Sequence, residues 1–165
     1  MRLFIGIKLD SNAQKKINNY FKFFYENKVT GNYTKITNLH MTLVFLGEVN
    51  DDKVPLIKDI IKSVNLEINE ISIFKIKMMR DILIGEVENS DVLTQLYDNL
   101  VKKLKQHGFM VDDHALYPHV TLVRKAGNVE KCVGMKTSIT SNFSRITLFE
   151  SKRINNDLIY VDLGE

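Results

Sequence analysis

The 165-residue chain has the length and composition of one folded domain. Apolar residues make up 44% and charged residues 26%, and the net charge of +3 lacks the strong basic excess of a dedicated nucleic-acid binder. The single cysteine, Cys132, excludes an intramolecular disulfide, and no apolar run is long enough to predict a membrane span. We therefore expect a cytoplasmic, monomeric protein that folds as a single domain over residues 1–165.

Strands and helices are predicted in turn along the first half of the chain. A strand is expected over residues 3–9, and Asp10 or Ser11 can cap a helix that runs to about Glu26. The polar stretch 28–38 is typical of a loop, and residues 39–46 read as a second strand. A second helix is expected to begin at Asp51 or Asp52. Pro55 is compatible with this start, since proline is tolerated in the first turn of a helix.

The second half begins with two strand candidates, 68–78 and 82–87, which predict a hairpin. Ser90 or Asp91 can cap a third helix that ends before Gly108. A loop over 109–117 then leads to a strand at 119–124, and a final hairpin is expected from 144–149 and 158–163, turning around 155–157. Strands that outnumber helices and come in hairpins indicate an α+β fold with antiparallel sheets.

One short pattern occurs twice, at His40–Val44 and at His119–Val123, about half a chain length apart. Each copy places a histidine and a threonine two residues apart in an apolar strand, so both side chains point to the same face. The repeat indicates two similar half-lobes, each offering one imidazole and one hydroxyl. Two proton-transfer groups and two neutral donors suit a phosphodiester, because one histidine can take a proton and the other can give one.

The flanks of these patterns resemble the 2H phosphoesterases, and within them the RNA 2′,3′-cyclic phosphodiesterases, also called 2′-5′ RNA ligases. Asn38–Gly47 is close to the first motif of that family and Pro118–Arg124 to the second, while Arg2–Ile7 and Leu148–Ser151 with Tyr160 are similar to its outer strands. The resemblance implies two pseudo-symmetric lobes of antiparallel sheet, with helices outside and a central cleft. It also implies hydrolysis of cyclic phosphate ends of RNA to a 2′-phosphate, with His119 as base and His40 as acid, and possible reverse ligation.

Further residues are assigned to substrate contact. Thr42 and Thr121 are expected to bind the phosphoryl oxygens, and the resemblance gives Arg124 a phosphate role. Strict strand alternation would place Arg124 opposite His119, so a bulge or the end of the strand is needed to bring it round. Possible base contacts are Phe4, which the resemblance places beside the cleft, and two tyrosines that could stack on a base, Tyr117 and Tyr160.

The remaining histidines, His107 and His114, are read as a helix-end residue and a solvated loop residue. No cofactor or metal is expected, since each motif supplies one ligand and the spare histidines lack zinc-type spacing. Three alternatives stay open: a family member that acts on a 2′-5′ oligonucleotide or a small cyclic nucleotide, a non-catalytic RNA-binding module, and a zinc hydrolase.

Overall fold

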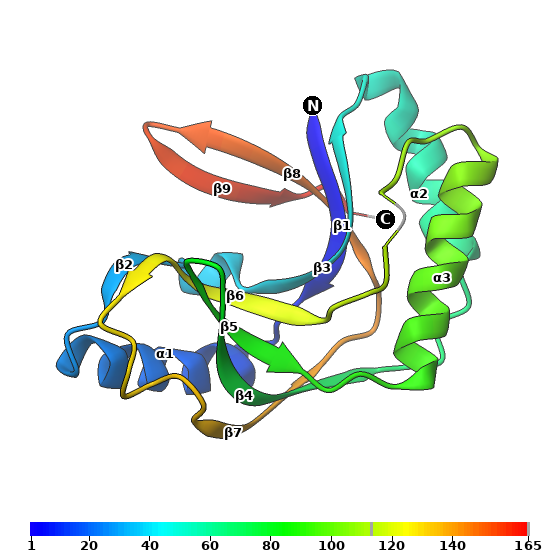
Figure 1. The fold of residues 1–165 in the computed structure, drawn as a ribbon. Coiled ribbons are helices and arrows are strands. Elements are labelled where there is room, and N and C mark those ends of the chain that lie inside the picture. Colours follow the sequence, from blue (N-terminus) through cyan, green and yellow to red (C-terminus); the bar gives the residue numbers. More distant parts are fainter. Residues whose placement is uncertain (113, 165) are drawn as a thin grey trace.

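The computed structural model describes residues 1–112 and 114–164. Asp113, in the predicted loop 109–117, and Glu165 lie outside the described residues. The helices are α1 (Ser11–Glu26), α2 (Val54–Ser63) and α3 (Asp91–Gln106), with short 3₁₀ turns at Ile36–Asn38 and Asp51–Lys53. The strands are β1 (Arg2–Lys8), β2 (Thr30–Tyr33), β3 (His40–Glu48), β4 (Glu70–Met79), β5 (Ile82–Val87), β6 (His119–Gly127), β7 (Lys136–Asn142), β8 (Thr147–Ile154) and β9 (Asp157–Asp162) (Figure 1).

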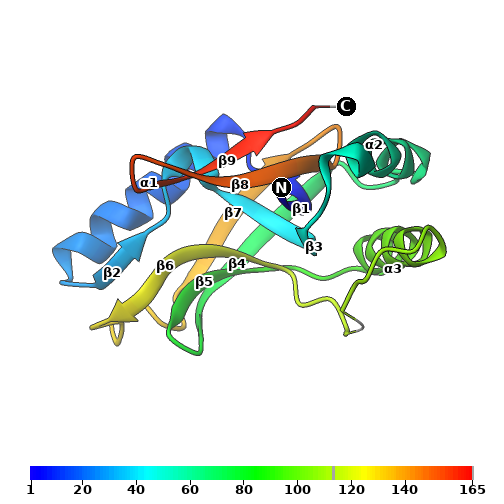
Figure 2. The ribbon, with the colours of Figure 1, turned by 90° about the horizontal axis from the view of Figure 1, so that it is seen from above.

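A single curled antiparallel sheet joins all of these strands. Its order is β7-β4-β5-β6-β3-β1-β8-β9, and β2 adds to the outer end of β6. The two motif strands, β3 and β6, therefore stand side by side at the centre, with three further strands on the path to either side. Figures 1 and 2 show the β8–β9 hairpin at one end of the sheet, α1 beside β7, and α2 and α3 next to each other. The predicted α+β class with antiparallel pairing is confirmed.

The hydrophobic core lies between the helices and one face of this sheet. Asp10 caps α1 by accepting a hydrogen bond from Ala13 N, and Ser90 caps α3 by accepting one from Leu93 N; each is the first of the two cap candidates left open by the sequence. The apolar stripes of these helices pack into one cluster that also contains Met41 of β3 and Val120 of β6, both 0% exposed. No helix within the described residues is long and apolar enough to cross a membrane.

Two of the strands were not predicted from the sequence. Residues 30–33 were expected to be part of a loop, yet they form β2, which pairs with β6; Gly31 has φ 130° and its α-carbon has no room for a side chain beside the Arg124 carbonyl. Residues 136–142 form β7, an edge strand with a largely polar sequence. β2 is exposed, and β7 has only one large apolar side chain, the buried Ile139, so neither sequence shows the apolar alternation that marks a half-buried strand.

Candidate active site

The two motif strands meet at a single point of backbone pairing, Met41 opposite Val120. Because the strands are antiparallel, this register sets His40 beside Thr121 and Thr42 beside His119. Met41 and Val120 point into the core, whereas the four motif side chains are half-buried on the other face of the sheet. We call this side of the sheet the motif face. The fold thus gathers two imidazoles and two hydroxyls on one surface.

Both imidazoles are oriented in the same way by the backbone just before them. His40 Nδ1 lies 2.7 Å from the Asn38 carbonyl oxygen, and His119 Nδ1 lies 2.7 Å from the Tyr117 carbonyl oxygen. A carbonyl only accepts, so each Nδ1 carries the hydrogen, and Nε2 becomes the atom that can accept or donate a proton. The Nε2 of His40 lies 2.8 Å from Thr42 Oγ1. Each motif therefore presents its reactive nitrogen in a defined direction.

The support of His40 extends to the far end of the sheet. The amide of Asn38 donates a 2.9 Å hydrogen bond to the Leu158 carbonyl of β9, which anchors the segment whose carbonyl orients the imidazole. Beneath the ring lies Gly6 of β1, where an added Cβ would stand 2.7 Å from the Met41 carbonyl oxygen and 3.5 Å from His40 Cδ2. Sequence reasoning missed both residues, although a glycine inside an apolar strand is a signal of close approach.

Burial sets the charge state of His40. The pKa of His40 is lowered to about 4. Desolvation by burial is the main cause, the charges of Arg124 and His119 act in the same direction, and the hydrogen bond to the Asn38 carbonyl opposes the shift. The contribution of Arg124 and His119 indicates that both lie close enough to His40 to act on it electrostatically. His40 is therefore neutral in the free protein at pH 7.

Acid should destabilise the fold through this residue. In the unfolded chain the imidazole takes up its proton near pH 6.5, whereas in the folded protein it does so only near pH 4. Because the unfolded state binds more protons between these values, the free energy of unfolding falls by about 3 kcal/mol as the pH is lowered through this window. Urea unfolding at pH 7 and pH 4.5 should show a smaller loss for His40→Gln than for the wild type.

The matched control is His107→Gln, since His107 is exposed at the end of α3 and its Nδ1 donates to the Lys103 carbonyl. This variant should keep the wild-type dependence on pH. If wild type and His40→Gln lose the same stability between the two pH values, the buried neutral state of His40 is wrong.

Two matching bulges bring further residues onto the motif face. In β6, Thr121 pairs with Ile84 but Val123 pairs with Leu83, so Leu122 is an extra residue. In β3 the extra residue is Leu43, at the equivalent position. A bulge reverses the alternation beyond it, which turns Arg124 toward the side of His119 and Thr121. This supplies the bulge that a phosphate role for Arg124 requires.

The aromatic residues predicted as base contacts fall on two sides of the motif pair. Phe4 and Tyr160 have ring centroids 4.9 Å and 5.0 Å from that of His40, and Phe149, which the sequence reading did not assign to the site, lies 6.0 Å away. We call these three residues the aromatic wall. Tyr117 stands on the other side, 5.5 Å from the His119 ring. Phe149 was missed because strand alternation alone does not say which face is the functional one.

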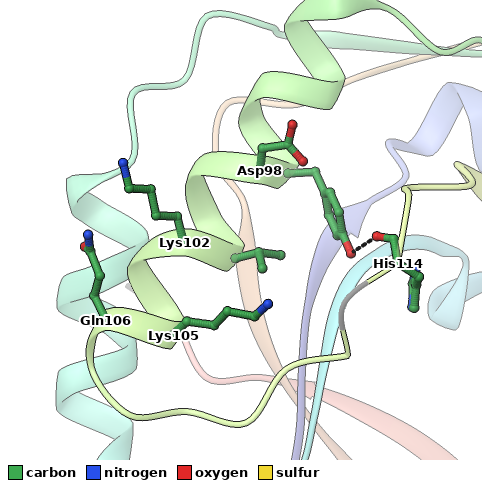
Figure 3. A pocket seen from close by; sticks show the side chains of 7 residues that line it. Asp98, Lys102, Lys105, Gln106 and His114 are labelled. Atoms are coloured by element: carbon green, nitrogen blue, oxygen red, sulfur yellow. Dashed lines mark hydrogen bonds between the residues drawn. The ribbon is translucent and has the colours of Figure 1, made fainter.

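Other candidates lie elsewhere. His114 lines a cavity of about 570 Å³ with the exposed side of α3, where Tyr97 Oη donates to the His114 carbonyl at 3.0 Å (Figure 3). None of the four motif residues lines this cavity. Cys132 is fully buried in the core. In the part of the chain that the structure describes, no three His, Cys, Asp or Glu side chains are grouped so as to hold a metal ion.

Comparison with known proteins places the chain in a family. A family model described as LigT like phosphoesterase matches residues 7–81. The RNA 2′,3′-cyclic phosphodiesterase of Thermotoga maritima is 29% identical over 131 residues, which cover 75% of this chain and 70% of that protein. The RNA 2′,3′-cyclic phosphodiesterase of Methanocaldococcus jannaschii is 30% identical over 129 residues, or 75% and 71% of the two chains.

Solved structures share the fold over nearly the whole chain. A structure described as a phosphoesterase superposes with a TM-score of 0.83 at 21% sequence identity, covering 99% of this chain and 95% of the other. LigT of E. coli, solved in complex with 3′-AMP, superposes with a TM-score of 0.81 at 23% identity, covering 99% and 94%. These likenesses establish the common architecture.

Proposed function

Because the chain belongs to the LigT-like phosphoesterases of the 2H family, we propose that it hydrolyses 2′,3′-cyclic phosphate ends of RNA by two-histidine acid–base catalysis. Family membership makes the protein a phosphoesterase. The substrate is proposed because the related proteins of Thermotoga maritima and Methanocaldococcus jannaschii are named for it. The 2′-phosphate product and the absence of a metal requirement are proposed with it.

The observation that carries the proposal is the register of the motif strands. The pairing of Met41 with Val120 places each histidine beside the threonine of the other motif, on one face. A phosphoryl group bound there could contact an imidazole and a hydroxyl from each strand. Arg124, turned to the same face by the bulge, adds a cation that can form charge-assisted hydrogen bonds to the phosphoryl oxygens.

In the proposed reaction, water attacks phosphorus in line with the departing ribose oxygen. As the new P–O bond forms, His119 Nε2 accepts a proton from the water. As the bond from phosphorus to O3′ breaks, His40 Nε2 donates a proton to that oxygen, which leaves a 2′-phosphate. Thr42 and Thr121 stabilise the charge on the non-bridging oxygens. Acid–base groups of this kind each contribute about 10²–10⁴-fold to the rate.

The acid role requires His40 to gain a proton, although its low pKa keeps it neutral in the free protein at pH 7. The bound phosphodiester carries a negative charge, and it also offsets the positive charge of Arg124. Both effects favour the protonated imidazole, so substrate binding and protonation of His40 are coupled. The same groups, run in reverse, could join a 2′-phosphate end to a suitable hydroxyl, although dilute aqueous solution favours hydrolysis.

A substrate panel tests the function. The purified protein should open uridine 2′,3′-cyclic phosphate and a cyclic-phosphate-ended oligonucleotide to 2′-phosphates in the presence of a chelator. It should act far more slowly on 2′-5′-linked oligonucleotides and on 3′,5′-cyclic nucleotides. Phosphorus NMR identifies each product, and a His40→Ala/His119→Ala preparation made in parallel controls for contaminating nucleases.

Other outcomes decide between the alternatives. Preference for a 2′-5′ linkage or a 3′,5′-cyclic nucleotide would assign the family chemistry to another substrate. Activity that disappears in chelator and returns with zinc would overturn the metal-free mechanism. Tight binding of RNA without any turnover in the panel would indicate a binding module.

A further inference from the structure

The two halves of the motif face differ in chemistry. On the side of β1, β8 and β9 the residues next to His40 are the aromatic wall. On the side of β5, β4 and β7 the register pairs His119 with Glu86, Glu86 with Lys75, and Lys75 with Lys136. Directly paired residues of an antiparallel sheet share a face, so this row of charged side chains extends outward from His119 on the motif face.

A neighbouring row contains a third lysine. Thr121 pairs with Ile84, and Ile84 pairs with Lys77. The Lys77 Nζ lies 3.8 Å from Glu86 Oε2 and 5.8 Å from the centroid of the Tyr117 ring. A carboxylate and an aromatic face thus hold this ammonium group next to the tyrosine whose carbonyl orients His119.

The pairing of Lys75 with Lys136 is unfavourable in the protein alone. Two like charges directly opposite each other destabilise a sheet, and both side chains are exposed. Among the described residues, neither lysine forms an ion pair. A bound anion would remove this repulsion, and successive phosphates would do so along the whole row.

We propose that Lys75, Lys77 and Lys136, the lysine track, bind the phosphates of the RNA strand that precedes the cyclic end. The inference rests on the proposed function and adds a preference for oligonucleotides over mononucleotides. β4 and β7 lie two and three strands from β6, or about 10 Å and 14 Å across the sheet. A mononucleotide whose base lies against the aromatic wall does not extend that far in the other direction, whereas a longer strand does.

The test compares kcat/KM for a uridine hexanucleotide ending in a cyclic phosphate with that for uridine 2′,3′-cyclic phosphate. The wild type should prefer the hexanucleotide by about tenfold or more. Lys75→Gln/Lys136→Gln should lose most of that preference through a higher KM, with the mononucleotide rate within about twofold of wild type. The slope of log kcat/KM against log salt concentration for the hexanucleotide should become shallower by about 1.4, or about 0.7 for each lysine removed.

Lys77 is not replaced in this variant, because it contacts Glu86 and Tyr117 beside His119 and its loss could disturb the active site. Lys102→Gln, an exposed lysine of α3, is the matched control and should keep the full preference. Lysines on an edge strand also discourage aggregation, but that role would not affect the choice of substrate.

Equal kcat/KM values for the two substrates in the wild type would refute the proposal that the lysine track binds RNA phosphates. An equal effect of the double variant on kcat/KM for the hexanucleotide and for the mononucleotide would refute it as well. If neither substrate is hydrolysed, the proposed function fails separately. Fluorescence anisotropy with a hexanucleotide bearing a 3′-phosphate then still tests the lysine track by measuring RNA affinity. Weaker binding by the double variant would support the proposed phosphate contacts, and unchanged binding would refute them.

Discussion

Replacing His40 or His119 by alanine should lower turnover of a cyclic-phosphate-ended RNA by at least about 10²-fold, because each change removes one partner in proton transfer. The two half-buried imidazoles share the motif face, and each is oriented by a 2.7 Å hydrogen bond to a backbone carbonyl. The loss should appear in kcat, since proton transfer occurs in the transition state. Single-turnover kinetics with saturating enzyme measures it without interference from product release.

His107→Ala and His114→Ala serve as matched controls, because one side chain ends α3 and the other lines the cavity beside that helix. Both variants should retain nearly full turnover. Circular dichroism and thermal unfolding at pH 7 should show that all four variants remain folded. A control variant as slow as the motif variants would mean that the site has been placed wrongly.

Replacing Arg124 by glutamine should reduce kcat/KM for a cyclic phosphate by about 10- to 10²-fold, the range expected for a hydrogen bond to a charged group of about 1.5–3 kcal/mol. It should also change the pH profile. The productive enzyme carries one proton on the pair of imidazoles, on the acid and not on the base. Binding of a second proton by the pair removes the base, so the acidic limb of kcat/KM reports the lower apparent pKa of the free enzyme and should lie near the His40 pKa of about 4. Since the positive charge of Arg124 lowers that pKa, its removal should move the limb to higher pH.

Arg124→Lys separates the two effects. Lysine keeps the positive charge, so the acidic limb should stay near its wild-type position, but lysine cannot form the forked hydrogen bonds of arginine and some activity should be lost. An unchanged rate and pH profile in Arg124→Gln would show that the bulge in β6 does not bring this side chain to the reacting phosphate.

Features with a local cause could be predicted from the sequence. Asp10 and Ser90 are short polar residues before an apolar stripe, and both cap the helices that follow. The shared face of His40 and Thr42, and of His119 and Thr121, follows from the two-residue period of a strand. The repeated motif also indicated the pseudo-symmetry that places β3 and β6 together at the centre of the sheet.

Features that depend on distant pairing could not be predicted. The bulge at Leu122 becomes visible only when β6 is aligned with β5, and nothing in the local sequence marks an extra residue. The polar strands β2 and β7 are stabilised by partners far along the chain. Phe149 reaches His40 because β8 pairs with β1, a contact between the two ends of the sequence.

Cooperation of the two imidazoles in one step can be measured as the single-turnover rate of the His40→Ala/His119→Ala double variant, compared with the two single variants on the same cyclic-phosphate-ended RNA in chelator. Two groups that act on one phosphate in one step lose their effect together, so removing the second after the first should cost little. The double variant should therefore react within about tenfold of the rate of the slower single variant. Losses that multiply across the two positions would contradict it, because the two imidazoles would then act independently.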